Sequence, residues 1–88
     1  MAGRPLSSVQ SAARVLCTFT AAERELGVSE LSRRLGLSKG AVHRILTTLA
    51  AENLIERNPR SGRYRLGLKL YQLGIVARSP AEPPIESL

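Results

Sequence analysis

A glycine between two short amphipathic segments constrains the fold of this chain more than any other feature of its sequence. The first segment is predicted to be a helix over residues 29–35, with Ser29 as its N-cap. Glu30 would then lie in the first turn, where the helix dipole favours a negative charge. Gly36 stands where this helix should end, because glycine readily takes the left-handed conformation that closes a helix.

The second segment is predicted to be a longer helix over residues 39–52, with Ser38 as its N-cap and Asn53, which tolerates a positive φ, as its stop. Its apolar residues recur at i, i+3, i+4 and i+7 and are Val42, Ile45, Leu46 and Leu49. Two short helices that cross at a glycine turn are typical of a helix-turn-helix. Such a corner needs apolar side chains pointing inward, and the chain supplies them at Leu31, Leu35, Leu37, Val42 and Ile45.

The opposite face of the second helix is predicted to be exposed and able to enter a major groove. A rotation of roughly 100° per residue places on it Gly40, Arg44, Thr47 and Ala51, with His43 and Thr48 at its flanks. Arg44 is the candidate for bidentate contact with guanine, whose O6 and N7 acceptors match the guanidinium fork. Ser38, Lys39 and the N–H groups at the helix start suit a phosphate.

Alternatives stay open for single residues on this face. Taken alone, Arg44 would be a solvated surface charge, whereas within the motif it is expected to contact the groove. His43 is either a DNA contact or a partly buried, hydrogen-bonded ring. A metal site is not expected, because His43 and Cys17 are the only histidine and cysteine of the chain.

A basic β-hairpin is predicted after the second helix, from strands over residues 54–58 and 63–66 and a turn over 59–62 with proline and glycine at its ends. Its arginines have no acidic residue among them and are Arg57, Arg60, Arg63 and Arg65. Arg60 and Arg63 are expected to clamp the DNA backbone or the minor groove. The alternative is a solvated loop.

An amphipathic helix over residues 9–19, started by a capping box of Ser7 and Gln10, is expected before the corner. Its apolar stripe would comprise Val9, Ala12, Ala13, Leu16 and Phe19. Cys17, at the edge of the stripe, is expected to be a small buried hydrophobe rather than a reactive thiol, since no cation lies beside it in the sequence. The predicted divisions are an N-terminal arm (1–7), a winged domain (8–66), a linker helix (67–78) and a flexible proline-rich tail (79–88).

Charge and composition favour a polyanionic partner. The net charge of the 88 residues is +6 with a pI near 10.8. Residues 33–69 hold nine basic and two acidic side chains, so this stretch carries +7 and the remainder −1. Asp is absent and no nucleophile–base pair is visible, so an enzyme and a bound cofactor are not expected. No signal peptide or membrane span is visible, so the expected location is the cytoplasm and no membrane partner is expected.

Three stretches of the chain, covering roughly residues 8–74, carry a resemblance to a known family. They are SVQSAARVLCTFT, VSELSRRLGLSKGAVHRILTTLAAENLIE and GRYRLGLKLYQLG, and the most specific parts are GLSKGAVHRILTTL and YRLGLKLYQLG. This sequence resembles the N-terminal domain of the IclR (isocitrate lyase regulator) family of bacterial transcription factors. The resemblance implies a mainly α fold with a small β-hairpin wing, a winged helix-turn-helix. It also implies recognition-helix positions at Ser38, Lys39, Gly40, His43, Arg44 and Thr47.

The resemblance further implies a function, namely sequence-specific binding of double-stranded DNA in transcription regulation, with repression as the expected sign. The partner would be a palindromic operator, bound by a homodimer and, in a full-length form, by a tetramer. Asn53 departs from the family, which mostly has glycine there, and this departure fits its predicted role as a helix stop. A GAF-like effector domain would follow the linker helix, so no effector-ligand site is expected in these 88 residues. The alternative function is a winged helix that docks on an acidic protein partner.

Overall fold

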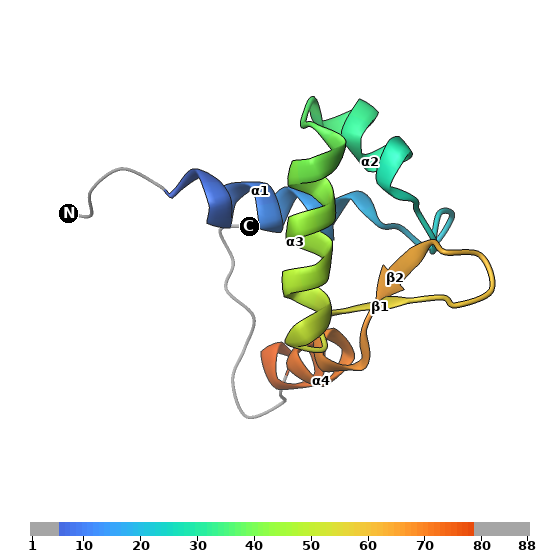
Figure 1. Cartoon of the computed structure of the whole chain (residues 1–88). Coiled ribbons are helices and arrows are strands. Elements are labelled where there is room, and N and C mark those ends of the chain that lie inside the picture. The colour runs from blue at the N-terminus through green and yellow to red at the C-terminus, as the bar shows by residue number, and fades with distance from the viewer. Residues whose placement is uncertain (1–5, 79–88) are drawn as a thin grey trace.

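Four helices and one antiparallel hairpin make up residues 6–78, the part of the chain that the computed structural model describes (Figure 1). The elements follow one another as α1 (Ser7–Thr18), α2 (Val28–Leu35), α3 (Lys39–Ala51), β1 (Ile55–Arg57), β2 (Tyr64–Leu66) and α4 (Leu68–Ala77). This order confirms the predicted mainly α fold with a small β wing, the winged helix-turn-helix. The predicted arm and tail fall largely on residues 1–5 and 79–88, which lie outside the described residues.

The corner between α2 and α3 forms as the sequence predicts. Gly36 follows α2 with a φ of 68°, and its N–H donates to the Ser32 carbonyl at 3.0 Å, which closes the helix. α3 begins after Ser38, whose Oγ accepts a hydrogen bond from the Ala41 N–H at 3.1 Å. Asn53 has a φ of 63°, the left-handed conformation expected of a helix stop. Gly36, Ser38 and Asn53 are thus confirmed in their predicted roles.

The start of α2 differs from the prediction by one residue. Its N-cap is Gly27, so the prediction of Ser29 as the cap is wrong. The Gly27 N–H donates to Oε1 of Glu30 at 2.8 Å, which places the capping acceptor in the first turn of the helix rather than before it. The predicted place of Glu30 in the first turn is confirmed.

The face that α1 buries matches the predicted stripe only in part: Phe19 is buried and Ala12 and Leu16 pack against the core, whereas Val9 and Ala13 are exposed. α1 begins at Ser7 without a side-chain cap, so the capping box with Gln10 is wrong. Val15, absent from the predicted stripe, is fully buried, whereas Val9 is 61% exposed. The reason is that an open groove separates the first turns of α1 from α3, so only the later turns reach the core. Cys17 is exposed, and the prediction that it is buried is also wrong.

One hydrophobic core holds α1, α2, α3 and the hairpin together. Its buried side chains are Val15, Phe19, Leu26, Leu31, Val42, Leu46, Leu49, Ile55 and Tyr64. Leu31 and Val42 are fully buried, and Leu35, Leu37 and Ile45 are half-buried against this core. The five residues predicted to point inward from the corner therefore do so. This packing fixes which face of α3 is left outside.

The hairpin is shorter than predicted and is attached to the segment before α2. β1 and β2 pair antiparallel, with Ile55 opposite Leu66 and Arg57 opposite Tyr64. Tyr64 also exchanges two backbone hydrogen bonds with Leu26, each 2.9 Å long. Leu26 therefore pairs with β2 at Tyr64, in addition to the pairing of β2 with β1. Backbone hydrogen bonds thus join the wing to the segment before α2.

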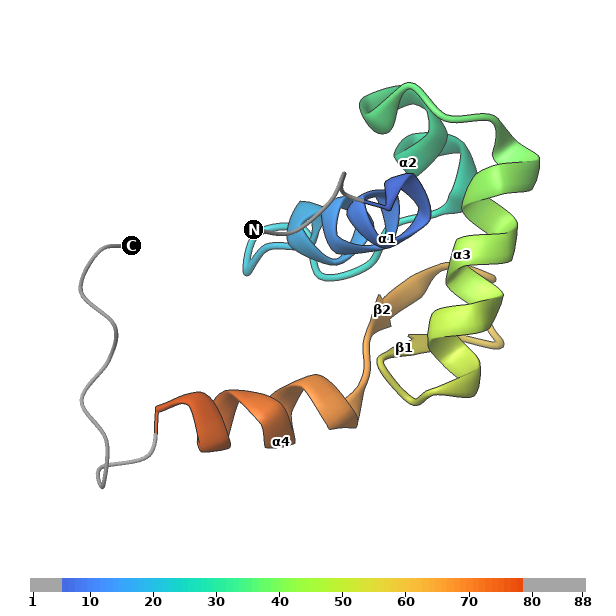
Figure 2. The same ribbon diagram turned by 90° about the vertical axis from the view of Figure 1, so that its left-hand side faces the viewer.

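α4 extends from the end of the hairpin, away from the core, as Figure 2 shows. It contains no buried residue. Its exposed large apolar side chains are Leu68, Tyr71, Leu73, Ile75 and Val76. The bounds of this helix agree to within one residue at either end with the helix predicted over residues 67–78.

Candidate nucleic-acid interface

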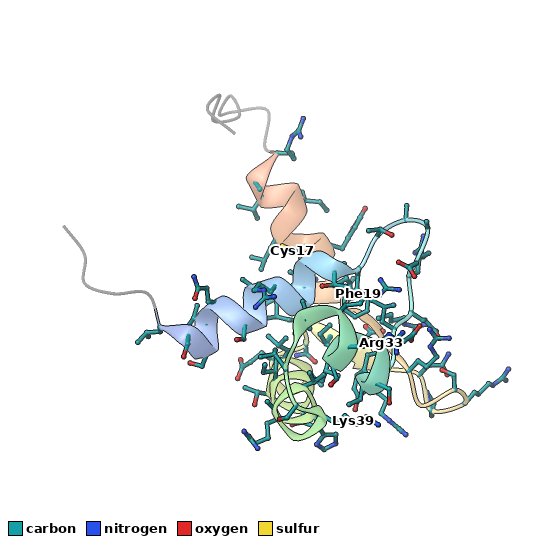
Figure 3. All side chains as sticks on the ribbon, turned by 90° about the horizontal axis from the view of Figure 1, so that it is seen from above. Cys17, Phe19, Arg33 and Lys39 are labelled. Atoms are coloured by element: carbon teal, nitrogen blue, oxygen red, sulfur yellow. The ribbon has the colours of Figure 1, made fainter. Side chains whose placement is uncertain are left out.

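The outward residues of α3 are exposed, as predicted. Each predicted site residue at this helix and its cap is exposed, and the set is Ser38, Lys39, Gly40, His43, Arg44 and Thr47. Figure 3 shows Lys39 at the start of the helix, at the edge of the molecule. The exposure of His43 excludes the alternative of a partly buried ring. Because Val42 and Leu46 anchor the inner face at 0% exposure, the outer face is held in a fixed orientation.

The side chain of Arg44 runs back along α3 towards the first turn. Its Nη1 lies 3.9 Å from the position that a Cβ on Gly40 would take. Long side chains in helices lean towards the N-terminus in this way. The absence of a side chain at Gly40 leaves room for this arrangement. The guanidinium therefore lies over the start of the helix, where unpaired N–H groups also favour a phosphate.

The two threonines of this face donate their hydroxyl protons to the helix itself. Oγ1 of Thr47 and Oγ1 of Thr48 both donate to the Arg44 carbonyl, at 3.1 and 2.7 Å. A hydroxyl that donates in this way keeps its lone pairs as acceptors. The Thr47 hydroxyl therefore suits acceptance from a base amino group, and the Thr47 methyl suits contact with a thymine methyl.

Serines at the start of α1 lie beside this surface, which the sequence analysis missed. Ser7, Ser8 and Ser11 line one side of an open groove of about 620 Å³, and Arg44 and Thr48 line the other. The groove brings serine hydroxyls next to the predicted reading face. The three serines are visible in the sequence, but there Ser7 was considered only as a helix cap.

The wing presents fewer unpaired cations than its sequence suggests. Arg57 and Arg60 are exposed and make no ion pair with any residue of 6–78. Arg60 lies in the turn, where its own N–H donates to Oδ1 of Asn58 at 2.9 Å. Within residues 6–78, these two guanidinium groups are the cations of the wing that are not held by an acid.

The other two arginines of the wing are paired with acids. Nη2 of Arg63 lies 2.7 Å from Oε1 of Glu30, and Nε of Arg65 lies 3.2 Å from Oε1 of Glu56. The hydrogen bond from the Gly27 N–H, together with the Arg63 guanidinium, lowers the pKa of Glu30. Glu30 comes from α2, so a local scan of the hairpin sequence could not reveal this pair.

Glu25, in the segment before α2, also contacts the wing. Its carboxylate accepts hydrogen bonds from Nδ2 of Asn58 at 2.9 Å and from Oγ of Ser61 at 3.2 Å. The bond from Asn58 is the main reason that the pKa of Glu25 is lowered. No local pattern in the sequence indicates this contact, because 33 residues separate Glu25 from Asn58.

Comparison with known proteins decides the family of this corner and wing. The family model of the IclR helix-turn-helix domain matches residues 8–59, which is more than half of the chain. The chain belongs to the IclR helix-turn-helix family.

Curated relatives of this IclR domain are transcriptional regulators. The glycerol operon regulatory protein of Streptomyces griseus is 45% identical over 71 residues, which are 81% of this chain and 28% of that protein. The HTH-type transcriptional regulator XynR of Escherichia coli is 39% identical over 69 residues, 78% of this chain and 27% of that protein. The chain thus spans a little over a quarter of the length of these relatives.

Solved structures share the fold of the IclR domain. An IclR transcriptional regulator from Alicyclobacillus acidocaldarius superposes with a TM-score of 0.78 at 37% identity, over 84% of this chain and 30% of that one. An IclR family regulator from Brucella abortus gives a TM-score of 0.80 at 28% identity, over 91% of this chain and 33% of that one.

Among residues 6–78, no helix is long and apolar enough to cross a membrane.

Proposed function

We propose that this chain is the DNA-binding part of an IclR-type transcriptional regulator, with α3 entering the major groove of double-stranded DNA. The observation that carries the proposal is the outer face of α3, which is polar, basic and exposed on a helix whose inner face is buried at Val42, Leu46 and Leu49. An α-helix held in this way fits the major groove, where each base pair presents its own pattern of donors and acceptors.

Each residue of this face has a role in the proposal. Arg44 reads a guanine, and Thr47 and His43 contact neighbouring bases. Ser38 and Lys39 hold a phosphate at the helix start, and Gly40 allows close approach. The exposure of all six residues and the path of Arg44 over Gly40 support this assignment.

The wing supplies the second contact of the proposal, with the adjacent backbone or minor groove. Arg60 is the main contact, because it is exposed and makes no ion pair within residues 6–78. Arg63 can add to this contact through the exposed 44% of its side chain, while its Nη2 is held by Glu30.

A symmetric homodimer on a palindromic operator completes the proposal, with half-sites about 10 bp apart or a multiple of that. The exposed apolar side chains of α4, together with Leu6 and Val9 of the α1 end, supply a surface for self-association. The domain would comprise residues 8–66 and the linker helix 67–78. The full-length regulator would act as a cytoplasmic repressor and assemble up to a tetramer.

Replacement of Arg44 tests the proposed reading of bases. The probe is a labelled duplex that the chain itself selects from a randomised pool, and fluorescence anisotropy measures its affinity. Arg44→Ala should cost about 1 to 3 kcal/mol on the selected duplex and much less on random-sequence duplex. Arg78→Ala, at the exposed end of α4, removes the same charge and should leave the discrimination between the two duplexes intact. Equal losses on both duplexes for Arg44→Ala would make it a phosphate contact instead.

A further inference from the structure

The turn of the wing is held on both sides by a single carboxylate. Oε2 of Glu25 accepts from Asn58, at the start of the turn, and Oε1 accepts from Ser61, near its end. The backbone closes the same turn, since the Gly62 N–H donates to the Asn58 carbonyl at 2.8 Å. Arg60 lies between the two side chains that Glu25 holds. The direction in which Arg60 leaves the wing therefore depends on Glu25.

A second acid holds the base of the wing against α2. Nη2 of Arg63 is bonded both to Oε1 of Glu30 at 2.7 Å and to the Glu25 carbonyl at 3.0 Å. Nε of Arg63 is buried without a hydrogen-bond partner in residues 6–78. The positive charge of the Arg63 guanidinium is therefore compensated chiefly through Nη2, which contacts Glu30. The Leu26–Tyr64 backbone pair lies in the same region. The segment 25–30 thus contacts the wing at its turn and at its base.

We propose that Glu25 and Glu30 are positioning residues for DNA binding, which fix the wing so that Arg60 meets the DNA while α3 occupies the groove. This inference rests on the proposed wing contact. Both acids act through the wing and touch no DNA themselves. Glu30 also belongs to α2, so one carboxylate connects the helix-turn-helix to the orientation of the wing.

The proposed positioning role predicts that neutralising these acids changes DNA affinity in the direction opposite to that expected from charge alone. Removing a negative charge from a domain of net charge +6 ordinarily strengthens its binding to a polyanion. If the two acids only repelled DNA or masked Arg63, their neutralisation would tighten binding. If they position the wing, their neutralisation weakens binding, because the turn that carries Arg60 is no longer held in one orientation.

The variants are Glu30→Gln and Glu25→Ala, each alone and combined with Arg60→Ala in the full 88-residue chain. Glutamine at position 30 removes the ion pair with Arg63 and still offers an oxygen to the Gly27 N–H, so the cap of α2 is kept. Glu52→Gln is the matched control, since Glu52 is exposed and its side chain has no hydrogen bond or ion pair within residues 6–78. Circular dichroism confirms the fold of each variant, and Glu25→Gln replaces Glu25→Ala if the latter does not fold.

Affinity is measured by anisotropy on the duplex that the wild-type chain selects from a randomised pool. We expect each acid variant to weaken binding more than about twofold, the lower end for coupled residues. Glu52→Gln should bind as the wild type or more tightly. In the Arg60→Ala background the further loss should be below about twofold, because the wing contact is already absent.

Four results would overturn the positioning role. The first is tighter binding by Glu25→Ala or Glu30→Gln, and the second is an equal loss with and without Arg60. The third is unchanged affinity of Arg60→Ala itself, which refutes the wing contact and with it the premise of this inference. A loss for Arg60→Ala without any loss for the acid variants refutes the positioning role alone and leaves the wing contact standing.

Discussion

Replacing Gly67 with alanine tests the junction between the wing and α4. A Cβ at this position would overlap the Asn53 carbonyl oxygen and lie 3.0 Å from the Leu54 carbonyl carbon. Both neighbours are backbone atoms, so no side chain can rotate away. The Gly67 N–H also donates to the Leu54 carbonyl at 2.8 Å, and this bond must lengthen or break if the chain moves aside.

The size of the effect follows from this overlap. Forcing extra volume into a packed site costs about 1 to 3 kcal/mol. For a domain of this size, 1 kcal/mol lowers Tm by about 4 to 8 °C, so a cost of about 2 kcal/mol corresponds to a fall of about 8 to 16 °C. Thermal unfolding followed by far-ultraviolet circular dichroism measures this fall in Tm.

Two other glycines serve as controls. Gly74→Ala, in α4 with nothing within 4 Å of the new Cβ, should not lower Tm, because alanine is the better helix former. Gly36→Ala also meets open space but requires a φ near 68°, and should cost about 1 kcal/mol through backbone strain. An unchanged Tm for Gly67→Ala would refute the close approach at this junction.

Three further predictions follow from the core, the cap and the acids of the wing. Leu46→Ala, at a fully buried position, should cost about 2 to 5 kcal/mol in denaturant unfolding, and a loss below 1 kcal/mol would contradict its place in the core. Ser38→Ala removes the cap acceptor of α3 and should cost about 1 kcal/mol, whereas Ser38→Asn should restore most of it. The pKa values of Glu25 and Glu30 are lowered from 4.5 in the folded state, so they stabilise the fold above that pH. Their contribution to Tm should be lost as pH falls below 4.5 through the folded pKa values, and Glu30→Gln should lessen this loss.

The corner was predictable from the sequence because its signals are local. Gly36, Ser38 and Asn53 each act on the backbone within a few residues, and the apolar spacing of α3 fixes which face is buried. α1 was less predictable, because its pattern allows more than one stripe. Only the position of α3 and the groove beside Ser7 select Val15 over Val9.

The candidate site likewise has one part that the sequence predicts, the face of α3, and one part that it does not, the ion pairing of the wing. The exposed face of α3 follows from helical periodicity, and the structure bears out the exposure of Arg44 and His43. Which wing arginines are left unpaired does not follow from the sequence, because folding brings Glu30 of α2 to Arg63 and Glu56 to Arg65. Glu30 lies 33 residues before Arg63, and no periodicity links the two. Net charge alone therefore overstates how many wing cations are free to bind.

The salt dependence of duplex binding tests the central claim most directly. Lys39, Arg57 and Arg60 are exposed cations on α3 and the wing, and we expect roughly two or three of them to neutralise phosphates in each domain. Log K should then fall linearly with log salt concentration, with a slope of about −2 to −3 per domain, twice that for a dimer. Arg60→Ala should reduce the slope by about 0.9 per domain. A duplex affinity that is undetectable at low salt, or independent of salt, would contradict DNA binding and favour a protein partner for this winged helix.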